Sequence, residues 1–349
     1  MPMSLRDVLM SPLWCAALFT SAKSFRDNRV LGSPRLNAWG LHAQRLRLAH
    51  GLAEQRRARL ASLVQAEDRA AFARDGFVIR RDALPPAQFA ALRDSLLAHR
   101  APAREMLQGD TVTRRIALDT ELLDAQPALK DFLRSPLWHG LSRYVGSFDQ
   151  EPVAYIQTIL SHVVAAPPDP QTHLHADTFH PTVKAWYFLT DVAADAGPFC
   201  YVPGSHRLSP ERLAWEQAKS LVAAQDPDIL TGRGSFRIRP DELPGLNLPE
   251  PKLFAVPANT LVVADTFGFH ARGPSLQPST RIEIWGYGRR NPFLPWAGAD
   301  LLSLPGLAER RVGWYWQALD WRERHFGKRS PWRDVGLVTP GEPARLAGH

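Results

Sequence analysis

Six short apolar segments between residues 151 and 290 constrain the fold of this chain more than any other feature. Each is rich in branched or aromatic residues, and Pro, Gly or Asp turns separate it from the next. The segments are 153–164, 183–192, 199–203, 253–257, 260–265 and 281–288. One helical insertion interrupts them, at 208–225. Many short strands with one such insertion favour a barrel or a sandwich over a parallel sheet with crossover helices.

The region before these segments has mainly helical rather than strand-like patterns. Residues 41–64 have the apolar spacing of a helix, and 76–80 form a short strand. Another helix is expected after Leu84, where Pro85 and Pro86 suit a first turn. The predicted organisation is a partly helical, arginine-rich N-terminal extension over 1–65, a β domain over 66–293, and a tryptophan-rich C-terminal extension over 294–349 that packs on the core.

The net charge of +7 has a local origin, because eight arginines between residues 26 and 59 face only Asp27 and Glu54. Such a run attracts acidic lipid headgroups, nucleic acid or an anionic substrate, although a solvated helix face is the simpler interpretation. The preceding apolar run, 8–22, is too short to span a bilayer. We expect it to pack on the domain, with peripheral membrane contact through residues 1–60 as the alternative.

The cysteine content bears on the compartment. Only Cys15 and Cys200 are present, which excludes a disulfide framework or a thiolate zinc site and favours a reducing, cytoplasmic environment, with a place at the inner face of a membrane left open. No basic groove interleaved with aromatic residues is evident, so a nucleic-acid partner is not expected.

The strongest chemical signal is THLHADTFH, residues 172–180. His175 and Asp177 are two positions apart, so in an extended segment their side chains point the same way. With a second histidine they form the two-His-one-carboxylate set that binds iron(II) and leaves positions open for other ligands. His270 is the best candidate, because it ends a strand-like segment just before the strand at 281–288.

Other residues compete for these roles. His173 also lies two positions before His175, but a His-x-His pairing leaves Asp177 without a role. Asp265 is an alternative carboxylate near His270, although a strand-end acid more often orients a loop or a histidine. Three other histidines compete for attention. His162 and His206 are interpreted as structural, and His180 as a possible substrate contact.

Polar residues near the triad are candidates for binding a co-substrate. Arg281 follows His270 by eleven positions, and its guanidinium suits a bidentate pair with a carboxylate of a 2-oxo acid. Lys184 and Trp186 share one strand face, where they would neutralise a carboxylate and wall a pocket, unless the strand is an ordinary core strand. Gln157, or Thr158 on the opposite strand face, is a candidate contact for the keto-acid end.

Together these motifs resemble the phytanoyl-CoA dioxygenase family of iron(II)/2-oxoglutarate-dependent oxygenases. The matching pieces are FARDGFVIRRDALPPAQFAALRDSL, HADTFHPTVKAWYFLTDV, GPFCYVPGSHR and DTFGFHARGPS followed by TRIEIW, within residues 66–293. The resemblance implies a mainly β fold with flanking helices and a double-stranded β-helix (jelly-roll) core. It also implies iron(II) on His175, Asp177 and His270, with the distal carboxylate of 2-oxoglutarate on Arg281.

The implied activity consumes 2-oxoglutarate and O2, releases succinate and CO2, and hydroxylates a C–H bond. Asp177 favours hydroxylation over halogenation, because related halogenating enzymes carry a small residue at that position. The apolar N-terminal run followed by arginines favours a lipid or acyl-type substrate, with a small metabolite as the alternative. A non-catalytic binding or regulatory module is the rival function, and a zinc hydrolase would leave Arg281 without a role.

Overall fold

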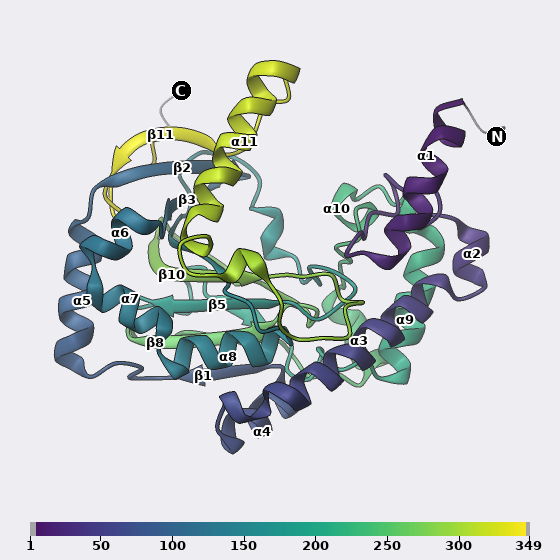
Figure 1. Ribbon diagram of the computed structural model, residues 1–349, viewed down its shortest axis with the longest axis horizontal. Helices are drawn as coiled ribbons and strands as arrows, with labels where there is room; N and C mark the ends of the chain where they lie inside the picture. Colours follow the sequence, from purple (N-terminus) through teal and green to yellow (C-terminus); the bar gives the residue numbers. More distant parts are fainter. Residues whose placement is uncertain (1–4, 347–349) are drawn as a thin grey trace.

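The computed structural model describes residues 5–346, which form two facing antiparallel β-sheets surrounded by helices (Figure 1). The larger sheet has eight strands in the order β1-β8-β5-β10-β4-β3-β2-β11, and the smaller has the order β7-β6-β9. Apolar side chains fill the interior, and single-residue bridges at His175 and Arg237 extend the smaller sheet. The mainly β fold with a jelly-roll core is therefore confirmed.

The expected strands all contain strand structure, although several are shorter than predicted. The segment at 153–164 ends at Leu160, just before a left-handed backbone conformation at His162 (φ 55°). The segment at 253–257 contributes only two strand residues, and Val256 then makes an isolated bridge with Val192. The observed strands are β1 (Phe77–Arg80), β4 (Val153–Leu160), β5 (Val183–Phe188), β6 (Phe199–Tyr201), β7 (Lys252–Leu253), β8 (Thr260–Asp265) and β10 (Thr280–Gly288).

Three further strands of the larger sheet were not predicted. They are β2 (Ala101–Gln108), β3 (Thr111–Ala117) and β11 (Arg333–Val338). β3 pairs with β4 and β2, and β11 adds the chain's C-terminal region to the edge of β2. These strands are rich in charge, and Arg114 and Glu105 form a fully buried ion pair of 2.6 Å between β3 and β2. Charged residues at buried positions hide the apolar alternation by which strands are recognised.

Helices cover the outer face of the larger sheet and one end of the fold (Figure 1). α5 (Pro86–Ala98), α7 (Pro127–Arg134) and α8 (Pro136–Gly146) bury apolar side chains against the outer face of β5, β8 and β10. The inserted helix α9 (Pro210–Val222) packs against the N-terminal helices α2 (Pro34–Ala38) and α3 (Leu41–Leu60). The remaining α-helices are α1 (Leu5–Ala16), α4 (Ala66–Asp75), α6 (Thr120–Ala125), α10 (Ile229–Gly232) and α11 (Arg311–Phe326).

The arginine run differs from a simple solvated face, because three of its members are buried. Arg45 donates to the carbonyls of Leu18, Thr20 and Ala22. Arg56 donates to carbonyls at 147, 292 and 294, and Arg57 pairs with a core carboxylate. α3 is therefore fixed to the core by its own cations, which favours the interpretation that this region packs on the domain. None of the helices within residues 5–346 combines the length and apolar character needed to cross a bilayer.

Candidate metal centre

His175 and His270 are brought together by the backbone of the smaller sheet. The amide of each donates to the carbonyl of the other, at 3.0 Å and 2.9 Å. Residues in such a hydrogen-bonded antiparallel pair lie directly opposite one another, so their side chains emerge on the same face. The ring centroids are 4.5 Å apart. His270 begins β9 (His270–Arg272) after a turn, whereas the sequence suggested that it ends the preceding strand.

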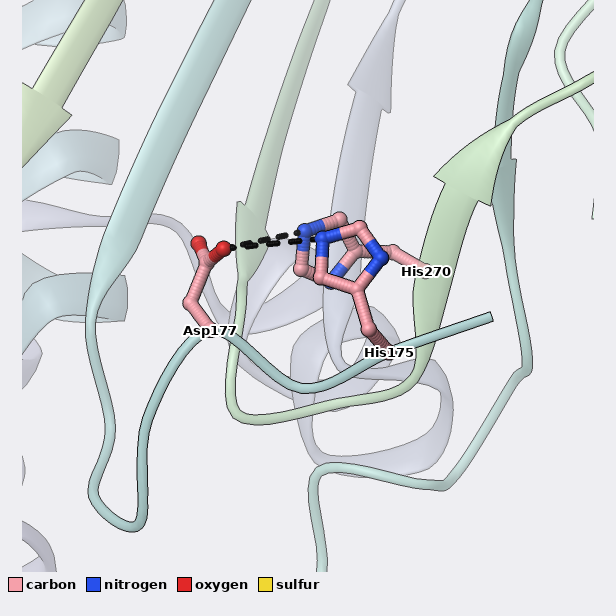
Figure 2. A group of neighbouring side chains, drawn as sticks. All are labelled: His175, Asp177 and His270. Atoms are coloured by element: carbon pink, nitrogen blue, oxygen red, sulfur yellow. Dashed lines mark ion pairs between the residues drawn. The ribbon is translucent and has the colours of Figure 1, made fainter. Parts of the chain in front are cut away.

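Asp177 completes the cluster two residues after His175 (Figure 2). Its amide donates to Thr266 O at 2.9 Å, which ties the segment to the turn before His270. Its Oδ1 lies 3.7 Å from Nε2 of His175 and 3.6 Å from Nε2 of His270. The three predicted ligands therefore present one donor atom each toward a common point, between the two sheets.

Both imidazoles are held in the form that a metal requires. Nδ1 of His175 lies 2.8 Å from His173 O, and Nδ1 of His270 lies 2.9 Å from Gly268 O. A carbonyl can only accept, so each Nδ1 carries the proton and each Nε2 keeps its lone pair. Burial lowers the pKa of His270 to about 4 and the pKa of His175 well below its ordinary value, so both rings are neutral at pH 7.

Lys184 lies beside the third ligand. Its Nζ is 2.6 Å from Oδ2 of Asp177 and 3.5 Å from Nε2 of His270. Burial alone would raise the pKa of Asp177, but the positive charge of Lys184 and the two imidazoles outweigh it and hold that pKa well below its usual range. In this structure Lys184 is thus paired with the carboxylate of a predicted metal ligand, while its predicted contact with a co-substrate stays a prediction.

Arg281 also lines the cavity that contains the triad, and it is not isolated. Its Nε lies 2.8 Å from Oε2 of Glu283, a fully buried carboxylate two positions along the same strand face, and its Nη1 donates to Gly197 O. Gln157 donates to the other Glu283 oxygen at 2.9 Å and accepts from Arg115 at 3.1 Å. Arg281 and Gln157 therefore belong to one buried polar network.

The cavity has a volume of about 380 Å³. Trp186 forms part of its wall and packs against Phe199, with ring centroids 4.1 Å apart. All seven residues singled out from the sequence line this one cavity. Sequence analysis missed four further cations on its wall, namely Lys23, Arg115, Arg272 and Arg289. Only Arg272 had a usable signal, since it lies two positions after His270 on the same strand face.

Asp265 has the orienting role expected of a strand-end acid. Its Oδ1 accepts from the amides of Thr182 and Phe267, at 3.1 Å and 3.0 Å, and its Oδ2 pairs with Arg57 at 2.9 Å. These contacts fix the turn that carries His270. Burial raises the pKa of Asp265, and the adjacent Arg57 opposes that shift.

The four other histidines considered from the sequence lie outside the cluster. His173 is exposed and contributes only its carbonyl. His180 is buried with Nδ1 on the carbonyl of Pro181, away from the cavity wall. His162 pairs with Asp110 at 3.1 Å. His206 packs against Phe72, with ring centroids 5.1 Å apart.

A jelly roll with two histidines and one carboxylate between its sheets is the arrangement of the non-haem iron oxygenase class. The model of the phytanoyl-CoA dioxygenase (PhyH) family matches residues 72–235 of the chain. The resemblance inferred from sequence motifs is thereby confirmed. The matched range contains His175 and Asp177 and ends before His270 and Arg281. Among curated proteins, none matches the chain.

Several solved structures resemble the chain at low identity. The epimerase SnoN from nogalamycin biosynthesis is 23% identical, over 65% of this chain and 82% of that one, with a TM-score of 0.43. HygX from Streptomyces hygroscopicus, with nickel and 2-oxoglutarate bound, is 18% identical over 64% and 87%, with a TM-score of 0.39. EctD from S. alaskensis with bound Fe is 16% identical over 71% and 85%, with a TM-score of 0.36. These resemblances are distant and do not bear on the substrate of this chain.

Proposed function

We propose that the chain is an iron(II)- and 2-oxoglutarate-dependent dioxygenase that hydroxylates a C–H bond of an acyl-type or small-metabolite substrate. The observation that carries the proposal is the convergence of two imidazole Nε2 atoms on Asp177 Oδ1, at 3.7 Å and 3.6 Å. Two neutral imidazoles and one carboxylate on one side of a cavity suit a divalent metal that keeps open positions.

The residues fit such a metal in detail. His175 Nε2 and His270 Nε2 face the cavity with their lone pairs, because each Nδ1 is engaged by a carbonyl. Asp177 is ionised and offers Oδ1, while Lys184 holds Oδ2. When bound, iron(II) and 2-oxoglutarate supply the oxidising chemistry, in which O2 is consumed and succinate and CO2 are released.

Arg281 and the residues around it are suited to hold the co-substrate. A guanidinium within a closed network is fixed in orientation, which favours a bidentate pair with the distal carboxylate. Glu283 and Gln157 provide that orientation through contacts of 2.8 Å and 2.9 Å. Trp186 and Trp285 are buried on paired positions of β5 and β10, and both line the cavity that contains Arg281 and the triad.

The experiment that tests the proposal measures succinate release from 2-oxoglutarate, with added iron(II), ascorbate and O2. A panel of fatty acids, acyl-CoA thioesters and small hydroxy or amino acids would be compared in the wild type. We expect at least one compound to raise succinate release above the uncoupled background, and His270→Ala to abolish it. The matched control is His162→Ala, which removes a histidine distant from the cluster and should leave release unchanged. Absence of any iron-dependent consumption of 2-oxoglutarate in the wild type would contradict the proposal.

A further inference from the structure

Cations lie at the start of β10 and immediately after its end. Arg281 lies at the start of the strand, and residues at every second position then follow one face. Tyr287, near the other end, is opposite Lys184, whose ammonium pairs with Asp177. Arg289 follows immediately after the strand and lines the same cavity. The strand therefore extends from the predicted co-substrate arginine, past the triad, to a second arginine.

The N-terminal segment brings another cation to the end marked by Arg289. Lys23 lines the cavity, and its ammonium donates to the backbone carbonyl of Asp177. The segment is fixed in place by Arg289, which donates to Ser21 O, and by Arg45, which donates to three carbonyls between residues 18 and 22. A segment outside the family match thus forms part of the wall beside the metal ligands.

Lys23 and Arg289 differ from the other cations of the cavity in their partners. Arg281 pairs with Glu283, Arg272 with Asp169 at 2.7 Å, and Lys184 with Asp177. Within the described part of the chain, neither Lys23 nor Arg289 forms an ion pair with a carboxylate. Nε of Arg289 is buried without a hydrogen-bond partner there.

Such uncompensated charge is costly to hold in a partly desolvated wall. A further cation nearby, Arg237, has its own partner in Asp228, at 3.4 Å. An anion bound between Lys23 and Arg289 would remove the imbalance with charge-assisted hydrogen bonds.

We infer that Lys23 and Arg289 form a subsite for an oxyanion of the substrate, either a carboxylate or a phosphate, at the end of the cavity opposite Arg281. The inference rests on the proposed function, since it assigns the substrate class of the same site. It makes the oxidised compound an acid or a phosphate ester, anchored by its charged group beside the triad. The N-terminal segment is then a determinant of specificity.

Binding of simple anions to the full chain tests the subsite. The protein would be loaded with Ni(II) and saturating 2-oxoglutarate, so that the triad and Arg281 are occupied, and titrated calorimetrically with inorganic phosphate and, separately, acetate. We expect at least one of the two anions to bind, and the one that binds more tightly identifies the preferred oxyanion. The double variant Lys23→Gln/Arg289→Gln should weaken its binding about tenfold or more. The matched control is Arg93→Gln/Lys130→Gln, which removes two surface cations of α5 and α7 and should leave the affinity unchanged.

Two further measurements distinguish failure of the anion subsite from failure of the proposed function. The visible absorption of the anaerobic iron(II)/2-oxoglutarate complex should be the same in the double variant and the wild type, since neither residue is a ligand. Arg289→Lys with intact Lys23 should keep most of the anion affinity, which guards against loss of fold in the double variant. Equal affinity in the double variant and the wild type, or no binding of either anion to a wild type with normal absorption, would overturn the subsite alone. Loss of the absorption in the wild type itself would contradict the proposed function.

Discussion

The ammonium of Lys184 lies 2.6 Å from Oδ2 of Asp177, while the other oxygen of that carboxylate faces the two imidazoles. The two oxygens of the Asp177 carboxylate therefore face different partners. Oδ1 remains for a metal, and Oδ2 is fixed by a charge from the larger sheet. On the proposed function, Lys184 would position the metal ligand Asp177 without itself being a ligand.

Replacing Lys184 should therefore weaken metal binding without removing a ligand. Lys184→Met should lower the affinity for iron(II) or Ni(II) about 10–100-fold, the usual effect of losing a residue that orients a metal ligand. Lys130→Met, at a partly exposed lysine on α7 that pairs with Asp124, is the control and should leave the affinity unchanged. Metal titration by calorimetry measures both, and an unchanged affinity in Lys184→Met would show that the ion pair does not position Asp177.

Because Arg281 pairs with Glu283, a variant of Arg281 alone would change both the stability of the protein and its affinity for 2-oxoglutarate. Arg281→Gln leaves Glu283 buried and unpaired, which should cost about 3–5 kcal/mol in the free energy of unfolding, in addition to weakening 2-oxoglutarate binding. The double variant Arg281→Gln/Glu283→Gln should recover most of that stability and none of the 2-oxoglutarate affinity. Urea denaturation and calorimetric titration separate the two effects, and metal binding should persist throughout. Recovery of 2-oxoglutarate binding in the double variant would show that Arg281 does not hold the co-substrate.

Arg57 links α3 to the turn before His270, and the prediction here concerns stability. Arg57→Met leaves Asp265 fully buried without its cation and should lower the free energy of unfolding by about 3–5 kcal/mol. Glu54, the other partner of Arg57 at 2.7 Å, has a side chain that is 72% exposed. Glu54→Gln is therefore the matched control and should change stability by less than about 1 kcal/mol. Equal effects in urea denaturation would contradict the anchoring role of Asp265.

Acid should destabilise the metal-free protein below about pH 6.5, the ordinary histidine pKa. Burial lowers the pKa of both His50 and His206 to about 3. Above pH 6.5 both imidazoles are neutral in the folded and in the unfolded protein, so they add no pH dependence to the free energy of unfolding. Between pH 6.5 and 3 only the unfolded state binds the proton, so each histidine removes about 1.4 kcal/mol per pH unit as the pH falls.

His206→Gln isolates one of these protons. The melting temperature of this variant, measured from pH 7 to 4.5 in the presence of a chelator, should fall less steeply than that of the wild type. An unaltered slope in His206→Gln would show that this side chain is not held neutral in the native state.

Most of the correct predictions of strands and site residues came from residues that lie close together in the sequence. The spacing of His175 and Asp177 indicates their common direction, and branched or aromatic residues between turn residues identify β5, β8 and β10 as strands. β2 and β3 were missed because Glu105 and Arg114 neutralise each other across strands, a relation that no local pattern contains. Lys23 was missed for the same reason, since 154 positions separate it from Asp177.

The interpretation of the arginine run shows where charge patterns mislead. Arg45, Arg56 and Arg57 resemble a solvated face in sequence, yet each is buried and donates to backbone carbonyls or to a carboxylate. The partners of Arg45 and Arg56 are mainly backbone carbonyls, which every sequence contains and which therefore give no signal.

The central claim is that His175, Asp177 and His270 bind iron(II) together with 2-oxoglutarate. Anaerobic addition of iron(II) and then 2-oxoglutarate to the metal-free protein tests it most directly, with absorption recorded in the visible range. The account predicts a weak charge-transfer band that saturates at one iron per chain and is absent from His175→Ala and Asp177→Ala. No band in the wild type, with zinc retained at the same site instead, would contradict it.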